Sequence, residues 1–414
     1  MALTFKKHQF ANGLKLIVHE NNNTPMATFH VTYNVGARCE NPERTGLAHL
    51  LEHYMFCGSV NVPKYDEPLQ KIGAINNAYT SSDLTCYYIN LPANNIETAF
   101  WLESDRMLSL AFDNKSLEIQ KSVVMEEFKE VQLNRPYSDL WSLFHEMVYK
   151  KHPYRWLVIG KELSHIENAT MDDIRNFYNK YYIPNNAVVA ISGNVKFEEM
   201  VRLGEKWFSD IPAGEIPINN YPQEPLQTEA RLLEVKRDAP NDMLVKGWKM
   251  CERKNNLFYA CDLLSDLLGS GYSSYLNREL VLKNKIFTDI NVYITANIEP
   301  GMFVFAGRPH TDIDLRKAND LLSETLYNFH YEPEDFAFHL QKVKNRVESV
   351  ILSNEMKAED CAAALASSEI IDSAEAFNND CDRYFAVTEA QIMEVMEQYI
   401  TPEKESTLLY EANY

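Results

Sequence analysis

The segment over residues 47–56 constrains the fold of this chain more than any other. It is apolar on every side of a helix and yet contains three polar side chains, His49, Glu52 and His53. An apolar surface around the whole circumference predicts a helix inside the protein, and histidines four residues apart project from one face of it. Buried charges without partners cost several kcal/mol. A divalent metal would supply the partner that these three side chains need.

The order of the polar residues, H-x-x-E-H, is the reverse of the commoner zinc-peptidase helix H-E-x-x-H. Two histidines at this spacing can direct both ring nitrogens to one zinc ion, with the glutamate beside them. The pattern therefore predicts a zinc-hydrolase site at His49 and His53. The alternative is a pair of core histidines bonded to backbone carbonyls, with Glu52 paired to an arginine.

A catalytic zinc site needs a third protein ligand and an open position for water. Residues 117–133 have helical periodicity and an apolar face. Glu127 falls on that face between Val123 and Val131, four residues from each, whereas the other glutamates project away: Glu118, Glu126 and Glu130. Glu127 is therefore the predicted third ligand, and its alternative role is a carboxylate at the rim of the core that pairs with a lysine.

Three stretches in the same order resemble the pitrilysin and insulinase family of zinc peptidases, which includes mitochondrial processing peptidase. They are GLAHLLEHYMFCGS at residues 46–59, GAINNAYTSSDLTCYY at 73–88 and SVVMEEF at 122–128. A further match covers residues 152–195, so the resemblance is dense in the first half of the chain. It implies a zinc endopeptidase built from two related halves that enclose the active site.

The residue types predict a mechanism for such a site. One zinc ion per chain, held by His49, His53 and Glu127, would polarise the peptide carbonyl and lower the pKa of its bound water. Glu52 is next to a ligand and cannot easily bind the same ion. We therefore expect Glu52 to take the proton of the water and pass it to the leaving amine, as general base and then general acid.

The resemblance also implies a substrate-binding segment. Residues 76–85 resemble the active-site edge strand of the family, to which a substrate peptide would add as an extra strand. Asn77 and Ala78 match the Asn-Ala pair of that strand, although for Asn76 and Asn77 the residues alone favour a polar loop. Gln120 stands where many relatives have a glutamate, so the groups that orient the metal ligands are expected to differ here.

The length of 414 residues exceeds a single hydrophobic core and predicts two domains. Four prolines over residues 211–227 indicate an extended linker, and both flanks alternate strands with amphipathic helices. We expect a zinc-binding catalytic domain at 1–212, a linker at 213–228 and a second homologous domain without the metal motif at 229–414. The predicted class is α+β, each domain being a mainly antiparallel sheet packed with helices. The resemblance adds a chamber enclosed with a partner subunit.

The composition excludes several other classes of protein. Seven scattered cysteines without a C-x-x-C motif indicate reduced thiols. No apolar run approaches the length of a membrane span, and the N-terminal residues lack the apolar core of a signal peptide. We therefore expect a cytoplasmic protein. A net charge of −19 argues against nucleic acid and anionic membranes as partners. Residues 269–271 (GSG) lack the third glycine of a dinucleotide loop, so no cofactor site other than the metal site is predicted.

The second half of the chain lacks a motif that active relatives carry. By the resemblance, an arginine and a tyrosine in a sequence like R-G-L-A-Y would hold the substrate carbonyl opposite the zinc. Asn284 and Thr288 occupy these positions, and a slip by one residue brings in Lys283 or Lys285 and Phe287, none of which is a tyrosine. We therefore expect the zinc-bearing subunit of a heterodimer whose other subunit supplies the Arg/Tyr pair. The alternatives are a self-sufficient homodimeric peptidase and a non-catalytic scaffold or binding subunit of the same fold.

Overall fold

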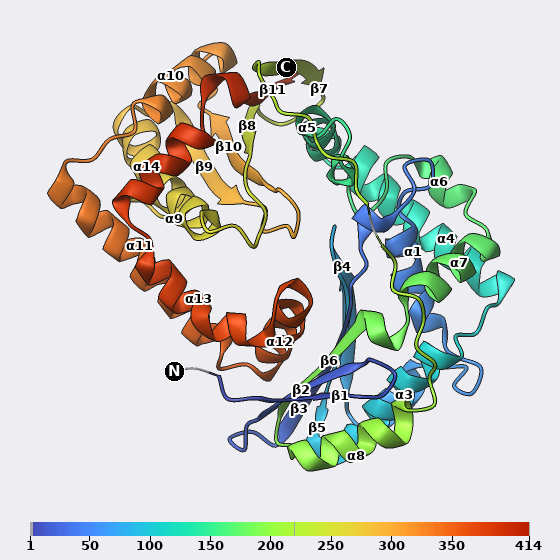
Figure 1. Cartoon of the computed structure of the whole chain (residues 1–414). Helices are drawn as coiled ribbons and strands as arrows, with labels where there is room; N and C mark the ends of the chain where they lie inside the picture. Colours follow the sequence, from blue (N-terminus) through green and yellow to red (C-terminus); the bar gives the residue numbers. More distant parts are fainter. Residues whose placement is uncertain (1–2, 219, 414) are drawn as a thin grey trace. The chain divides into compact units, whose positions relative to one another are not determined.

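The computed structural model describes residues 3–218 and 220–413 (Figure 1). The chain divides into two compact units, each built from three separate segments. Unit 1 comprises Met1–Val131, Trp156–Pro222 and Leu352–Asn378, and unit 2 comprises Gln132–Arg155, Gln223–Ile351 and Asn379–Tyr414. Each unit contains one mainly antiparallel sheet packed with helices, which confirms the predicted α+β class.

The packing units are discontinuous, whereas the sequence predicts contiguous domains at 1–212 and 229–414. Residues 132–155 pack within unit 2, and residues 352–378 pack within unit 1. The contiguous boundaries stay a prediction about two related halves of the sequence. The packing itself depends on contacts between residues far apart in the chain, which local periodicity does not report.

Unit 1 contains a six-stranded sheet in which only β2 and β6 pair in parallel. Alternate residues of its central strand β3, such as Phe29 and Val31, face the main core of the unit. The strand order is β1 (Lys6–Gln9), β2 (Lys15–Glu20), β6 (Ala187–Gly193), β3 (Met26–Tyr33), β5 (Thr85–Pro92) and β4 (Ile75–Thr80). Strand β4 is therefore an edge strand with one hydrogen-bonded neighbour, β5.

Helices cover both faces of this sheet. On the core side lie α1 (Leu47–Tyr54), α2 (Asp66–Lys71), α3 (Ile96–Leu108), α4 (Asn114–Lys129), α6 (Leu163–Glu167), α7 (Met171–Tyr181) and α8 (Phe197–Phe208). On the opposite side, α12 (Ala358–Ile371) places Ala362 and Leu365 against Val188 and Ala190 of β6. The small side chains of Ala362 and Ala190 allow the helix to lie close to the strand.

Unit 2 contains a five-stranded sheet in which only β7 and β11 pair in parallel. The order is β7 (Arg231–Arg237), β11 (Ser406–Ala412), β8 (Met243–Lys249), β10 (Met302–Pro309) and β9 (Phe287–Ile294). Helix α5 (Leu140–Val148) packs on one face through Phe144. The other face packs against α9 (Phe258–Gly269), α10 (Leu315–Tyr327) and α14 (Glu389–Gln398). Among the described residues, two α-helices span a boundary between the units in the sequence, α11 (Pro333–Asn354) and α13 (Ala374–Ala386).

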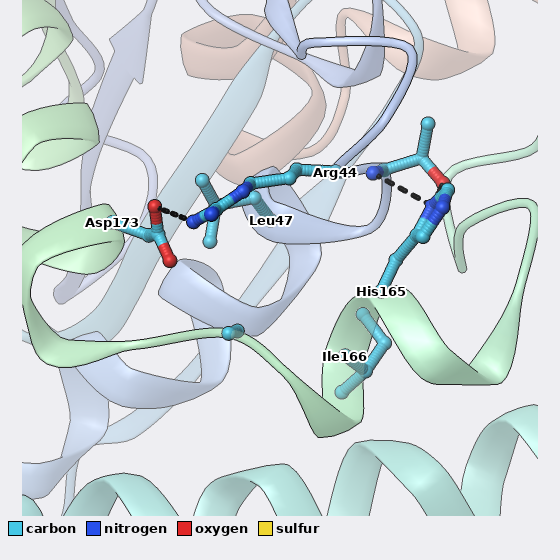
Figure 2. A pocket seen from close by; sticks show the side chains of 7 residues that line it. Arg44, Leu47, His165, Ile166 and Asp173 are labelled. Carbon is cyan, nitrogen blue, oxygen red and sulfur yellow. Dashed lines mark hydrogen bonds and ion pairs between the residues drawn. The ribbon is translucent and has the colours of Figure 1, made fainter.

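The loop that leads into α1 packs against α6 and the start of α7 (Figure 2). Arg44 forms an ion pair with Asp173 of α7, and the Thr45 backbone N–H donates to Nδ1 of His165 at 3.2 Å. Ile166 lies beside this loop in the same small pocket. The entry to α1 is therefore fixed by contacts within unit 1.

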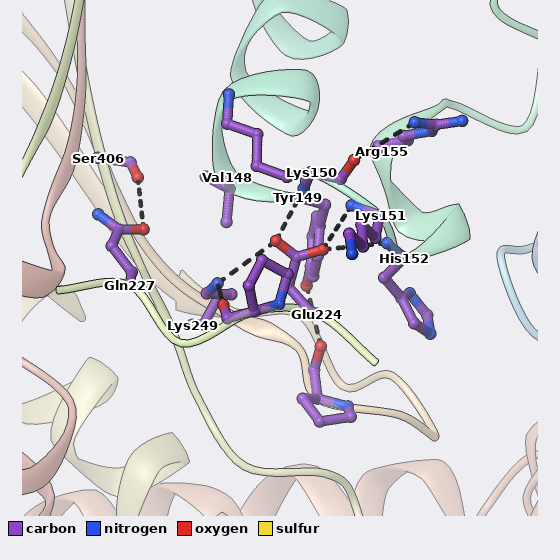
Figure 3. A network of polar contacts seen from close by, with 12 residues as sticks. Val148, Tyr149, Lys150, Lys151, His152, Arg155, Glu224, Gln227, Lys249 and Ser406 are labelled. Carbon is purple, nitrogen blue, oxygen red and sulfur yellow. Dashed lines mark hydrogen bonds and ion pairs between the residues drawn. The ribbon is translucent and has the colours of Figure 1, made fainter. Parts of the chain in front are cut away.

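The proline-rich stretch is fastened to unit 2 at Glu224 (Figure 3). Its carboxylate accepts hydrogen bonds from the backbone N–H groups of Lys150, Lys151 and His152 at 2.8, 2.8 and 3.0 Å. Burial alone would raise the pKa of Glu224, but these N–H donors and Lys249 lower it. The stretch is therefore an ordered connection at this point. No helix within the described residues is long and apolar enough to span a lipid bilayer.

Candidate metal centre

Helix α1 contains the three polar residues singled out in the sequence. It is eight residues long, and its side chains Leu50, Leu51 and Tyr54 are fully buried. His49 and His53 lie on the same side, with ring centroids 4.7 Å apart. Their side chains are 13% and 25% exposed, so both remain within reach of a solvent-borne ion.

Glu127 approaches the two imidazoles from α4. Its Oε2 atom lies 3.9 Å from Nε2 of His49 and 3.6 Å from Nε2 of His53. One ligand atom of each residue can be chosen so that all three lie within 4.8 Å of one another. In the part of the chain that the structure describes, this is the only group of three or more His, Cys, Asp or Glu residues that meets this condition.

Glu127 lies at the edge of the buried face of α4, because its neighbour Val123 is 46% exposed. The buried residues of that face include Leu117, Val124 and Phe128. The α-helix ends at Lys129, and a π-helical turn follows over Glu130–Asn134. A partly exposed carboxylate at this position can bind an ion from solvent, because it is not buried in the core.

The donor set of these three residues fits zinc, which binds imidazole nitrogen and carboxylate oxygen. The structure does not favour the alternative in which His49 and His53 are core histidines bonded to backbone carbonyls. Among the described residues, no backbone carbonyl accepts a hydrogen bond from His49 or His53, and Nδ1 of His49 is buried without a partner. Glu52 likewise bonds a hydroxyl, that of Thr80, and forms no ion pair with an arginine there.

The electrostatics of the group favour the metal-binding form of both histidines. Burial, with a smaller contribution from His53, lowers the pKa of His49 to about 4. Burial also lowers the pKa of His53, although the charge of Glu127 opposes this. Both rings are therefore neutral at pH 7, which is the protonation state that a metal ligand requires.

Glu52 is held apart from the other three. It is 8% exposed, and the Thr80 hydroxyl of β4 donates to its Oε2 atom. Burial raises the pKa of Glu52, with Thr80 opposing and the charge of Glu127 adding to the effect. A carboxylate with a raised proton affinity suits general-base chemistry. The sequence did not predict this role of Thr80, although Thr80 lies within the stretch that resembles the substrate strand.

Asn77 and Ala78 lie on the edge strand β4, where the residues alone favour a polar loop. They pair with Tyr88 and Tyr87 of β5. The strand alternates, so that Ala78 and Thr80 face α1 and Asn77 faces the opposite side. The Ala78 N–H donates to the side-chain oxygen of Asn77 at 2.9 Å. A peptide that used this N–H would displace the Asn77 side chain.

Gln120 connects the two helices of the centre. Its Nε2 atom lies 3.4 Å from Sγ of Cys57, which follows α1. Asn284 and Thr288 lie in unit 2, whereas the His–His–Glu group lies wholly in unit 1. The Thr288 hydroxyl donates to the Arg308 carbonyl at 3.0 Å.

The sequence of this chain is similar to those of known peptidases. Residues 16–160 match the family described as Insulinase (Peptidase family M16), and residues 168–345 match the Peptidase M16 inactive domain. The zinc protease PqqE of Helicobacter pylori is 31% identical over 86% of this chain and 81% of its own length. The mitochondrial-processing peptidase subunit beta of Saccharomyces cerevisiae is 30% identical, over 53% of this chain and 48% of that protein.

Solved structures have the same architecture. A protease from Helicobacter pylori superimposes with a TM-score of 0.91 and 26% identity, covering 99% of this chain and 100% of that one. A peptidase M16 inactive domain from Pseudomonas fluorescens gives a TM-score of 0.87 at 17% identity, covering 100% of this chain and 98% of that one. At this lower identity the second likeness concerns the fold alone.

Proposed function

Because the chain belongs to the insulinase family, peptidase family M16, we propose that it is a zinc-dependent endopeptidase acting on oligopeptides or unfolded polypeptide segments. The observation that carries the proposal is the convergence of His49, His53 and Glu127 within 4.8 Å. Glu52, which lies on α1 with the two histidines, supplies the proton-transfer group. The relative PqqE is named a zinc protease, which agrees with this proposal.

Each residue of the centre has one role in the proposed reaction. His49, His53 and Glu127 hold zinc, which when bound polarises the scissile carbonyl and lowers the pKa of water. Glu52 accepts the proton of the attacking water and delivers it to the leaving amine. The Thr80 hydroxyl occupies one oxygen of Glu52 and leaves the other for this proton transfer.

The substrate is proposed to bind as an extended strand along β4. This strand has a free edge, and a peptide can pair with it through main-chain hydrogen bonds that do not depend on sequence. The small side chain of Ala78 leaves room on the face toward α1. Asn77 bonds the Ala78 N–H in the free chain and would release it to the peptide. Oligopeptides and unfolded segments fit this mode because they can become fully extended.

Metal analysis tests the assignment of the ligands. Protein purified without added metal should contain close to one zinc per chain, and a His49→Ala, His53→Ala double variant should contain none. Glu127→Gln should weaken zinc binding, because a neutral amide oxygen is a poorer ligand. Glu126→Gln is the matched control, since Glu126 is the neighbouring carboxylate on the same helix and pairs with Lys129. Full zinc occupancy in the double histidine variant would refute the proposal.

We further propose that the chain is the zinc-bearing subunit of a heterodimer. Two observations support this: Asn284 and Thr288 stand where an Arg/Tyr pair is expected, and one relative is named a beta subunit. The test compares peptidase activity of the isolated chain with activity after mixing with a paralogue that carries the Arg/Tyr motif and lacks H-x-x-E-H. High turnover by the isolated chain, unchanged by the paralogue, would favour the self-sufficient homodimer. Zinc binding without activity in either state would favour the scaffold role.

A further inference from the structure

The N-terminus of α1 depends on a buried carboxylate that comes from outside the helix. Glu40 is 6% exposed, and its Oε2 and Oε1 atoms accept hydrogen bonds from the N–H groups of Gly46 at 2.9 Å and Ala48 at 2.8 Å. The buried indole of Trp156 donates to the same Oε2 atom at 3.1 Å. Both oxygens of one carboxylate are therefore occupied by donors that surround the start of the helix.

Within the described part of the chain, the N-cap residue of this helix offers no side-chain cap of its own. The first N–H groups of a helix lack partners within the helix, and a Ser, Thr, Asp or Asn side chain at the N-cap usually satisfies one of them. Here the N-cap is Gly46, which has φ +84° and no side chain that could do so. A Cβ atom there would stand 2.9 Å from the Ile159 carbonyl oxygen, so the close packing requires glycine. The capping group must come from elsewhere, and it comes from Glu40.

The loop between Glu40 and Gly46 is held by contacts with α6 and α7. The two residues before Gly46 make these contacts (Figure 2): Arg44 pairs with Asp173, and Thr45 forms hydrogen bonds with His165. These contacts fix the course of the backbone into the helix, whereas Glu40 contacts the helical N–H groups themselves. Glu40 therefore holds the N-terminal end of α1 by direct hydrogen bonds.

Resting on the proposed zinc function, we infer that Glu40 is a positioning residue of the metal centre. His49 follows Ala48 directly, and Glu52 and His53 lie one turn later, so all three move with the capped end of this short helix. Metal–ligand distances must be met to within about 0.2 Å. A small tilt or rotation of α1 therefore alters the geometry of both histidine ligands together.

The variant Glu40→Gln tests this inference with little change of volume. Both carboxylate oxygens accept from N–H groups, so an amide must turn its own NH₂ group toward a donor. We expect the Kd for Zn²⁺ to rise about 10–100-fold, the usual effect of losing a group that orients metal ligands. The d–d absorption bands of the Co²⁺-substituted protein should shift. We also expect kcat to fall by a larger factor than KM changes, because the hydrogen bonds of Glu40 go to the start of α1 and to Trp156 and not to β4, the proposed substrate strand.

Glu43→Gln is the matched control, because it makes the same chemical change in the same loop at an exposed position. Its Kd for Zn²⁺ should stay within about twofold of wild type. A folded Glu40→Gln protein with wild-type Kd and cobalt spectrum would overturn the inference and leave the proposed function intact. If Glu40→Gln does not fold, the variant Trp156→Phe replaces it in the test. Trp156→Phe removes one hydrogen-bond donor to Glu40 and keeps an aromatic ring. An unchanged Kd for Zn²⁺ in Trp156→Phe would overturn the inference. Absence of a Zn²⁺ site from the wild-type chain would overturn the proposed function, and this inference with it.

Discussion

His30 should make the stability of unit 1 depend on pH. It lies on β3, on the face of the sheet that α12 covers, and it is fully buried. Its Nδ1 atom is 3.1 Å from the Thr32 hydroxyl, and Nε2 has no hydrogen-bond partner among the described residues. Burial lowers the pKa of His30 from 6.5 to about 4. The ring is therefore neutral in the folded chain at pH values where the unfolded chain is already protonated.

The magnitude follows from linkage between protonation and folding. Because the pKa is lower in the folded chain, the unfolded chain binds more protons between about pH 6.5 and pH 4, and stability falls as the pH falls through that window. Each unit of pKa is worth 1.36 kcal/mol, so the full effect is about 3.4 kcal/mol. Between pH 7 and pH 4.5 the two titration curves give a loss of about 2.4 kcal/mol from this one residue.

Urea unfolding of the metal-free protein at pH 7 and pH 4.5 measures this loss. The variant His30→Gln cannot titrate at this position, so its free energy of unfolding should fall by about 2.4 kcal/mol less than that of wild type between the two pH values. His330→Gln is the control, since the His330 side chain is 72% exposed in unit 2. Equal losses in wild type and His30→Gln would refute the reasoning, because they would mean that His30 contributes nothing to the acid sensitivity.

Three further predictions concern unit 1. Glu52→Gln should retain zinc in elemental analysis and lose peptidase activity by roughly 10²–10⁴-fold, and activity within about twofold of wild type would assign the base to another group. Gly46→Ala should lower the free energy of unfolding by more than about 1 kcal/mol, whereas Gly73→Ala, which has φ +68° in open space, should have a smaller effect in the same denaturation assay. Arg106→Leu should destabilise the chain by about 3–5 kcal/mol, because it leaves the buried Glu103 carboxylate without its 2.7 and 2.8 Å hydrogen bonds; a change in melting temperature near zero would contradict this.

Local sequence pattern is sufficient to predict which side of a helix a residue occupies. The apolar surroundings of His49 and His53 predict a buried helix, and α1 is one. The position of Glu127 follows from the same periodicity, although Val123 beside it is exposed. Such positions can be predicted locally because the face of a helix is fixed by spacing along the chain.

Contacts between distant residues were not predictable in this way. The polar sequence of β4 favours a loop, and its pairing with β5 makes it a strand, so tertiary context overrides local preference. Thr80 and Glu40 reach α1 only through the fold, and nothing in their own sequence neighbourhood indicates those contacts. The same holds for α12, whose alanine-rich sequence does not reveal which sheet it covers.

Helix α12 comes late in the sequence but packs within unit 1. This affects the order in which the chain can fold during synthesis. Residues Ile17, Val188 and Ala190 are buried partly by this helix, so a nascent chain that ends in the proline-rich stretch would leave them in contact with water. Unit 1 can therefore complete its fold only after residue 378 has left the ribosome. Because unit 2 in turn needs residues 132–155, a cut within the proline-rich stretch gives two fragments that each lack part of their own core.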